Sequence, residues 1–177
     1  MGLILAAVLA IIIAIFSVLF ITLEFYVGII GRLKGAPFVA SRPGRIRTMI
    51  ELACIKEGMR VVDLGSGDGS IVIEAARAGA TATGIEMNPF LIPYSRWRAK
   101  RAGVGGRTTF IKGEIKNFSL RDTHVVFLYL LPGLLARLSP KLTSELAPGA
   151  LVISNAFPIP GWTPAQEKDD IFLYRIQ

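Results

Sequence analysis

The chain has 177 residues, 52% of them hydrophobic, a mean hydropathy of +0.53 and a formal net charge of +7. Such an apolar bias in a short chain favours a membrane segment over an oversized core. A single cysteine excludes an intramolecular disulfide, and the single histidine, His124, has no Cys or His neighbour at ligand spacing, so we expect no metal.

The first predicted element is an N-terminal transmembrane helix. No charged residue occurs from Gly2 to Leu23. At 1.5 Å per residue, about 20 apolar residues span the ~30 Å hydrocarbon layer. The run has no basic region before it and no small-x-small cleavage site after it, so a retained anchor is favoured over a signal peptide. We expect an anchor at residues 1–30, with residues 2–30 in contact with the bilayer.

Basic residues next to this run predict its orientation. No Lys or Arg precedes the run, whereas five follow it closely: Arg32, Lys34, Arg42, Arg45 and Arg47. Because basic flanks stay on the cytoplasmic side, we expect a single-pass membrane protein with its N-terminus outside. The following domain should face the cytoplasm, or the mitochondrial matrix in a eukaryote. The simplest interpretation of the local positive charge is attraction to anionic headgroups, at ~1 kcal/mol per residue, with nucleic-acid binding a less economical alternative.

The rest of the chain predicts a linker followed by one α/β domain. Residues 31–41 (GRLKGAPFVAS) contain helix-breaking Gly and Pro, and a helix should begin near Pro43. Strands and helices then alternate, with strands expected at 59–64, 81–86, 108–112, 124–130, 150–155 and, at an edge, 171–176. Helices are expected at 70–78, at 89–102 after an Asn88 cap, and from Pro132 with an interruption near Pro140. This order predicts a mostly parallel sheet covered on both faces, over residues 42–177.

A glycine-rich turn after the first strand of this domain predicts a nucleotide-cofactor site. Residues 61–70 read VVDLGSGDGS, and such a turn lies at the carboxyl end of a parallel strand, where ligands bind. A dinucleotide fingerprint would need its third glycine at position 70, which is Ser70, and the chain has no Gly-Lys-Ser or Gly-Lys-Thr. The pattern D-x-G-x-G-x-G resembles motif I of class I S-adenosylmethionine-dependent methyltransferases.

Acidic residues after the second and third strands fit the same resemblance. A carboxylate at Glu86 can accept both hydroxyls of a ribose, although NAD-binding proteins also use an acid at this distance. Glu114 stands where methyltransferases of this class contact the adenine amine. The alternative is that these acids only cap helices or turns. We predict S-adenosylmethionine as the cofactor, bound by Asp63, Gly65, Ser66, Gly67, Gly69, Glu86, Met87, Asn88 and Glu114.

Motifs on either side of the turn narrow the resemblance. They are GAPFVAS at 35–41, NPF at 88–90, YSR at 94–96 and FPIPGWTP at 157–164. In this order the chain is similar to small membrane-anchored methyltransferases related to the mitochondrial lysine methyltransferases of the ATP synthase c subunit and the adenine nucleotide translocase. The similarity covers nearly the whole chain. It implies a Rossmann-like class I methyltransferase that modifies a lysine side chain of a membrane or membrane-proximal protein.

The predicted substrate pocket is aromatic and apolar. A lysine must lose a proton from a reference pKa near 10.4 before it can accept a methyl group, and apolar surroundings favour the neutral amine. No particular base is required, so we assign no catalytic residue. Candidates for the pocket wall are Phe38, Tyr129, Leu131, Pro132, Phe157, Pro158 and Trp162, with core packing an equal alternative for Tyr129 and Phe157.

Other acceptors stay open at this stage. Enzymes that methylate base amines or glutamine amides typically carry Asn/Asp-Pro-Pro-Tyr after the fourth strand, whereas this chain has Leu130-Leu131-Pro132. That departure argues against DNA, and we do not expect a nucleic-acid partner, but it leaves ribosomal RNA open. A lipid or hydrophobic small molecule is the main alternative acceptor. A non-catalytic cofactor-binding module is a third possibility.

Overall fold

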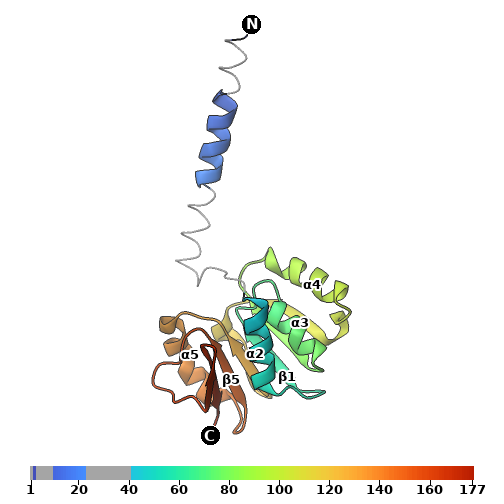
Figure 1. The fold of residues 1–177 in the computed structure, drawn as a ribbon, viewed down its shortest axis with the longest axis vertical. Helices are drawn as coiled ribbons and strands as arrows, with labels where there is room; N and C mark the ends of the chain where they lie inside the picture. The colour runs from blue at the N-terminus through green and yellow to red at the C-terminus, as the bar shows by residue number, and fades with distance from the viewer. Residues whose placement is uncertain (1, 3–9, 23–40) are drawn as a thin grey trace. The chain divides into compact units, whose positions relative to one another are not determined.

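The computed structural model describes residues 2, 10–22 and 41–177 (Figure 1). The chain divides into two compact units, Met1–Phe38 and Val39–Gln177. In the first unit, residues 10–22 are helical and their side chains are exposed. The remainder of the predicted anchor, residues 31–40 of the predicted linker and the pocket candidate Phe38 lie outside the described residues. The predicted boundaries of anchor and linker therefore stay predictions.

The predicted single-pass localisation is contradicted. Among the residues described, no helix is both long and apolar enough to cross a membrane. The sequence-based prediction counted one continuous apolar helix from Gly2 onward. The described helical segment, residues 10–22, rises only about 20 Å at 1.5 Å per residue, which is less than the ~30 Å hydrocarbon layer.

The second unit is built on a seven-stranded sheet with the order β3-β2-β1-β4-β5-β7-β6. Its strands are β1 Arg60–Leu64, β2 Thr81–Glu86, β3 Thr108–Lys112, β4 Val125–Leu128, β5 Leu151–Asn155, β6 Gln166–Lys168 and β7 Ile171–Arg175. Strands β1 to β5 pair in parallel, and β7 runs antiparallel to both β5 and β6. This confirms the predicted α/β fold with a mostly parallel sheet.

Strand β7 was expected at the edge of the sheet, and this expectation is wrong. The edge is β6, which forms a hairpin with β7. Hydrophobic patterning carries no signal for β6, because Gln166, Glu167 and Lys168 are all polar and exposed. A strand that is formed by backbone pairing alone is not visible in such a pattern.

Helices cover both faces of the sheet (Figure 1). They are α2 Pro43–Ala53, α3 Ser70–Arg77, α4 Leu91–Arg101 and α5 Pro132–Glu145, with short 3-10 turns at Gly105–Arg107 and Ile115–Asn117. Helix α5 continues through Pro140 instead of breaking there, and Lys141 and Glu145 form an ion pair of 2.5 Å across its last turn. Helix α4 begins two residues later than predicted. The side chain of Asn88 accepts a hydrogen bond from the amide of Phe90 and forms a local turn in place of a helix cap.

Two apolar clusters hold these layers together, one on each face of the sheet. Successive side chains of β1 point to opposite faces of the sheet. Val61 belongs to the cluster under α2, α3 and α4, whereas Val62 and Leu64 belong to the cluster under α5. Polar side chains at the carboxyl ends of the central strands are thereby fixed between two packed layers.

Candidate active site

The glycine-rich turn lies at the switch in strand order. It connects the end of β1 to the start of α3, and β1 stands between β2 and β4 in the sheet. Its three glycines, Gly65, Gly67 and Gly69, all have positive φ, at 89°, 52° and 78°. In open parallel sheets this edge is the usual place for a ligand.

The turn is packed closely against its neighbours. A Cβ atom at Gly69 would lie 2.7 Å from Cε1 of Phe110 in β3, which is too close for any larger residue without a shift. A Cβ atom at Gly84 of β2 would lie 2.6 Å from the Ser66 hydroxyl. The path of the turn therefore depends on glycine both in the turn itself, at Gly69, and in β2, at Gly84. The sequence motif includes Gly69 but not Gly84.

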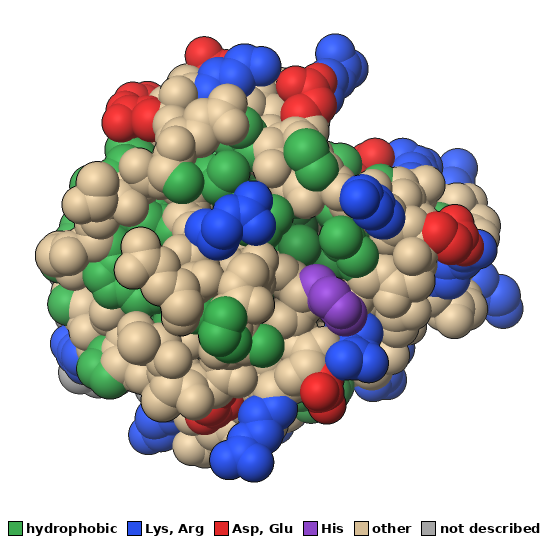
Figure 2. Space-filling model, turned by 90° about the horizontal axis from the view of Figure 1, so that it is seen from below, with side chains coloured by type: hydrophobic (Ala, Val, Ile, Leu, Met, Phe, Trp, Pro, Cys, Tyr) green, Lys and Arg blue, Asp and Glu red, His purple; other side chains and the backbone are tan. Residues whose placement is uncertain are grey.

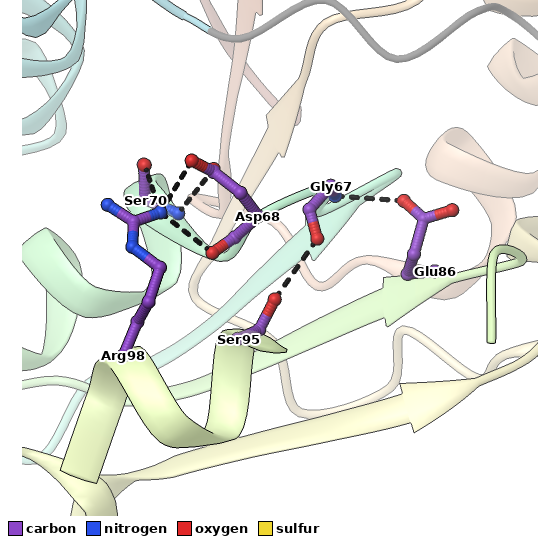
Figure 3. A network of polar contacts seen from close by, with 6 residues as sticks. All are labelled: Gly67, Asp68, Ser70, Glu86, Ser95 and Arg98. Carbon is purple, nitrogen blue, oxygen red and sulfur yellow. Dashed lines mark hydrogen bonds and ion pairs between the residues drawn. The ribbon is translucent and has the colours of Figure 1, made fainter. Parts of the chain in front are cut away.

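Glu86 connects the turn to the segment after β2. One carboxylate oxygen accepts a hydrogen bond of 2.8 Å from the amide of Gly67 (Figure 3). The other accepts a hydrogen bond of 2.8 Å from the amide of Asn88. The acid thus does stabilise a turn, as the alternative interpretation proposed. A carboxylate has about four acceptor positions, so these two bonds leave capacity for ligand hydroxyls.

Helix α4 holds the turn from the other side. The buried Ser95 hydroxyl donates to the carbonyl of Gly67 at 3.1 Å, and the Arg98 guanidinium donates to the carbonyl of Asp68 at 2.9 Å and to the Ser70 hydroxyl at 2.8 Å. Arg98 also forms an ion pair of 2.5 Å with the Asp68 carboxylate (Figure 3). The sequence analysis assigned neither residue to the site, although Ser95 lies within the YSR motif at 94–96. Their spacing of three positions places them on the same side of a helix, and this was the sequence signal that could have indicated a shared contact with the turn.

Asp63 is a buried carboxylate at the end of β1, with 3% of its surface exposed. Burial raises its pKa to about 8, and the charges of Glu86 and Asp68 add to the shift. Within residues 41–177 it makes no side-chain hydrogen bond or ion pair. A cationic group beside it would favour the ionised form, so the site fits a ligand with an ammonium head.

The remaining predicted cofactor residues follow β1, β2 and β3, which pair in parallel. Asp63, Glu86 and the three glycines share one sheet edge, and Met87 and Asn88 follow directly and are exposed. The Ser66 hydroxyl is buried without a hydrogen-bond partner among the described residues. Glu114 follows β3, is exposed, and forms an ion pair of 2.8 Å with Lys116. The individual binding roles stay predictions.

The predicted pocket residues follow β4 and β5, which pair in parallel. Tyr129 is half-buried and is followed by the exposed Leu131 and Pro132, while the half-buried Phe157 and the exposed Pro158 come after β5. Neighbouring parallel strands end at the same edge, so these side chains are brought to the side of the sheet that carries the turn.

The loop after β5 is fixed by three hydrogen bonds. Ser154 donates to the carbonyl of Phe157 at 2.6 Å, the Ile159 amide donates to the Tyr174 hydroxyl at 2.9 Å, and the Trp162 indole donates to the Ser139 hydroxyl at 2.7 Å. The Trp162 ring also meets Tyr174 edge to face at 5.6 Å. These contacts explain the position of Trp162 without a substrate.

A buried asparagine at the end of β5 is a second feature that sequence reasoning missed. The Asn155 side-chain oxygen accepts a hydrogen bond of 2.7 Å from Arg45 of α2, and its amide nitrogen donates to the Ser41 hydroxyl at 3.3 Å. Arg45 also pairs with Asp170 at 2.8 Å. The start of α2 is thereby tied to the site edge of the sheet.

His124 lies away from this edge, at the amino end of β4. Its Nδ1 accepts a hydrogen bond of 3.0 Å from the Arg60 amide. Figure 2 shows a face of the molecule on which basic and apolar side chains are interspersed. In the part of the chain that the structure describes, no group of three or more His, Cys, Asp or Glu side chains could hold a metal ion.

Comparison with known proteins agrees with this fold. The family model of the ANTKMT methyltransferase domain matches residues 63–166. A rat lysine N-methyltransferase of the ATP synthase c subunit is 40% identical over 128 residues, which cover 72% of this chain and 59% of that protein. A protein-lysine N-methyltransferase of Saccharolobus islandicus is 36% identical over 132 residues, which cover 73% of this chain and 82% of that protein.

A solved structure agrees as well. The crystal structure of an RNA methyltransferase from Salinibacter ruber in complex with S-adenosyl-L-homocysteine has a TM-score of 0.73 and 38% identity, and the match covers 78% of this chain and 92% of that chain. This neighbour, bound to the demethylated cofactor, agrees with the predicted S-adenosylmethionine. The chain spans about three-fifths of the rat relative. The matched region carries the whole turn from Asp63 to Gly69 together with Glu86, and the chain belongs to the ANTKMT methyltransferase domain family.

Proposed function

We propose that this protein transfers a methyl group from S-adenosylmethionine to a lysine side chain of a protein. The observation that carries the proposal is the pair of carboxylates, Asp63 and Glu86, on either side of a glycine turn whose Gly67 amide is bound by Glu86 at 2.8 Å. The names of the rat and Saccharolobus relatives support lysine as the acceptor.

The cofactor fits the residues present at this edge. When bound, it supplies a methyl group on a sulfonium centre, which is already activated for transfer. Asp63 offers a buried acid for its ammonium group, and Glu86 offers carboxylate oxygens for its hydroxyl groups. Gly65, Ser66, Gly67, Gly69, Met87, Asn88 and Glu114 complete the proposed binding set.

The acceptor side needs alignment and exclusion of water more than acid–base chemistry. In this proposal Tyr129, Leu131 and Phe157 supply an apolar wall beside the turn. The loop that carries Phe157 is held by hydrogen bonds at Phe157 and Ile159. An apolar wall lowers the pKa of an entering lysine amine and so favours the neutral nucleophile. Positioning of this kind can contribute about 7 to 11 kcal/mol in well-oriented systems.

The proposal also concerns the kind of protein that carries the acceptor lysine. The rat relative is named for the ATP synthase c subunit, and we extend the proposal to a lysine on a membrane or membrane-proximal protein. A second candidate acceptor is RNA, because the Salinibacter neighbour is titled an RNA methyltransferase. No catalytic base is assigned in either case.

One experiment tests the cofactor site and the acceptor class together. Purified protein is incubated with methyl-labelled cofactor and an extract from cells that lack the gene, and label is measured separately in protein, RNA and lipid. We expect label in protein, on lysine by mass spectrometry. Label confined to RNA or lipid would overturn the lysine assignment.

The matched variants are Glu86→Gln and Glu74→Gln. Glu74 is a half-buried residue of α3 that pairs only with Arg77 among the described residues, so loss of its charge should leave cofactor binding unchanged in calorimetry. Glu86→Gln keeps the volume of the side chain but removes its charge, and we expect cofactor affinity to fall about tenfold or more, in line with about 1.5 to 3 kcal/mol for a charge-assisted hydrogen bond. Equal binding by both variants would remove Glu86 from the site.

A further inference from the structure

Helix α4 and the segment before it expose an unusual group of large side chains. We call it the α4 aromatic face, and it consists of Met87, Phe90, Tyr94, Trp97, Lys100 and Arg101. Phe90 is 82% exposed, Trp97 54% and Tyr94 47%. The opposite side of the helix, with Ile92, Ser95 and Ala99, is buried against the domain, so the three rings are not part of the core.

The spacing and composition of this face are those of a binding surface. Phe90, Tyr94, Trp97 and Arg101 follow one another at intervals of four, three and four residues, which places them along one side of a helix. Aromatic residues, Met and Arg are enriched at the centres of protein interfaces, and Trp, Tyr and Arg dominate their binding energy. Rings of this size exposed together therefore indicate a partner.

The charge around this face selects an acidic partner. From Met87 to Gly113 the chain has no Asp or Glu and six basic residues: Arg96, Arg98, Lys100, Arg101, Arg107 and Lys112. Arg98 and Arg107 already pair with Asp68 and Glu57. The others form no ion pair among the described residues, and two of them, Lys100 and Arg101, belong to the α4 aromatic face and give it a positive charge. A second copy of this chain is disfavoured, because the net charge of +7 makes two copies repel.

The arrangement of the rings favours a protein over single-stranded nucleic acid. Tyr94 and Trp97 stack on each other at a centroid distance of 6.0 Å, and the guanidinium groups of Arg98 and Arg101 lie 5.8 and 5.5 Å from the Tyr94 and Trp97 centroids. Base stacking needs ring faces that are open to the base. Here the Tyr94 and Trp97 rings already have each other and a guanidinium group as neighbours, so their faces are less open to a base.

The face adjoins the proposed methyl-transfer site. Met87 directly follows Glu86, and Ser95 and Arg98 of the same helix hydrogen-bond the glycine turn. Arg98 contacts both the Tyr94 ring and the Asp68 carboxylate, so one side chain links the face to the turn. A partner bound here lies beside the cofactor-binding residues.

We propose that the α4 aromatic face docks an acidic segment, containing apolar side chains, of the protein that carries the acceptor lysine. This inference rests on the proposed function, because it identifies the partner as the methyl-accepting protein. The apolar side chains of the segment contact Phe90 and Trp97, and its carboxylates face Lys100 and Arg101.

Fluorescence anisotropy with the full chain tests the proposal. The probe is a fluorescein-labelled twelve-residue peptide of alternating Glu and Leu with one central Lys, compared with its Gln-for-Glu counterpart. Labelled oligouridylate of twelve nucleotides and phosphatidylglycerol vesicles are run in parallel. We expect the acidic peptide to bind best and its binding to weaken as salt is raised.

Variants identify the surface. Trp97→Ala should weaken binding of the acidic peptide about 30-fold, as for a typical hot-spot residue, and Arg101→Glu on the order of tenfold. Arg137→Glu makes the same charge change on an exposed arginine of α5 and should alter binding less than about twofold. Unchanged calorimetric cofactor binding by Trp97→Ala shows that the variant is folded.

The opposing outcomes are distinct. The docking surface is overturned if no probe binds, or if Arg137→Glu weakens the peptide as much as Arg101→Glu does. Stronger, Trp97-dependent binding of oligouridylate or vesicles overturns the assignment of a protein partner. The anisotropy assay includes no transfer step, so its result is independent of the labelling experiment. Peptide binding in this assay, together with no label in any fraction of the labelling experiment, would refute the proposed function and leave the docking surface standing.

Discussion

Arg98 provides the sharpest test of how the glycine turn is held. We consider Arg98→Met, which keeps most of the apolar stem and removes the guanidinium. The change breaks an ion pair of 2.5 Å with Asp68 and hydrogen bonds of 2.9 and 2.8 Å to the Asp68 carbonyl and the Ser70 hydroxyl. The side chains of Arg98 and Asp68 are only 30% and 22% exposed, so water replaces these contacts poorly.

The expected cost follows from these contacts. Hydrogen bonds to charged groups contribute about 1.5 to 3 kcal/mol each when buried, and partial exposure together with shared geometry reduces the sum to about 2 to 3 kcal/mol. For a domain of this size, that loss lowers the thermal midpoint by about 6 to 12 °C. Cofactor binding should weaken in the same variant, because the turn loses its contact with α4.

The assay is urea unfolding, followed by circular dichroism, with Arg77→Met as the matched control. Arg77 and Glu74 form an ion pair of 2.6 Å on the same domain, but their side chains are 52% and 41% exposed. Exposed pairs of this kind contribute about 0 to 1 kcal/mol. Equal loss of unfolding free energy in Arg98→Met and Arg77→Met would refute the view that Arg98 holds the turn.

Three further predictions concern stability. Because the pKa of Asp63 is raised to about 8 from an ordinary 3.8, the folded state binds more protons between these values, and the unfolding free energy should fall as pH rises from 5 to 8. Asp63→Asn should flatten that profile in urea titrations, and an equally steep profile would contradict the assignment. Gly69→Ala should cost about 2 to 4 kcal/mol through its clash with Phe110, whereas Gly103→Ala, at a similar φ but with open space, should cost about 1 kcal/mol; equal losses would argue against close packing. Tyr174→Phe should cost about 1 to 3 kcal/mol by leaving the Ile159 amide without an acceptor, and a loss no larger than in the exposed control Tyr94→Phe would count against this.

Sequence information was sufficient for features that depend on local pattern. The parallel strands, the glycine turn and the position of Glu86 all follow from hydrophobic runs and residue spacing, and the structure brings Asp63 and Glu86 to one edge as expected. Contacts between distant segments were not predictable in this way. The bonds of Ser95 and Arg98 to the turn, and of Arg45 to Asn155, join residues 28 to 110 positions apart.

Two predictions failed because hydrophobicity alone was taken to define an element. The N-terminal transmembrane helix was predicted from hydrophobicity alone, and among the described residues no helix is long and apolar enough to cross a membrane. Conversely, β6 has no apolar residue and was not predicted, although its backbone pairs with β7.

The hairpin formed by β6 and β7 protects the sheet from self-association. β7 is largely buried and apolar, and as an outer strand it would present a template to which another chain could add a strand. The three-residue β6 covers it with Gln166, Glu167 and Lys168, which are polar and exposed. Charged side chains on a short outermost strand are a common means by which proteins avoid edge-to-edge aggregation. Truncation or apolar substitution of these three residues should therefore promote oligomers through β7, without any change at the cofactor turn.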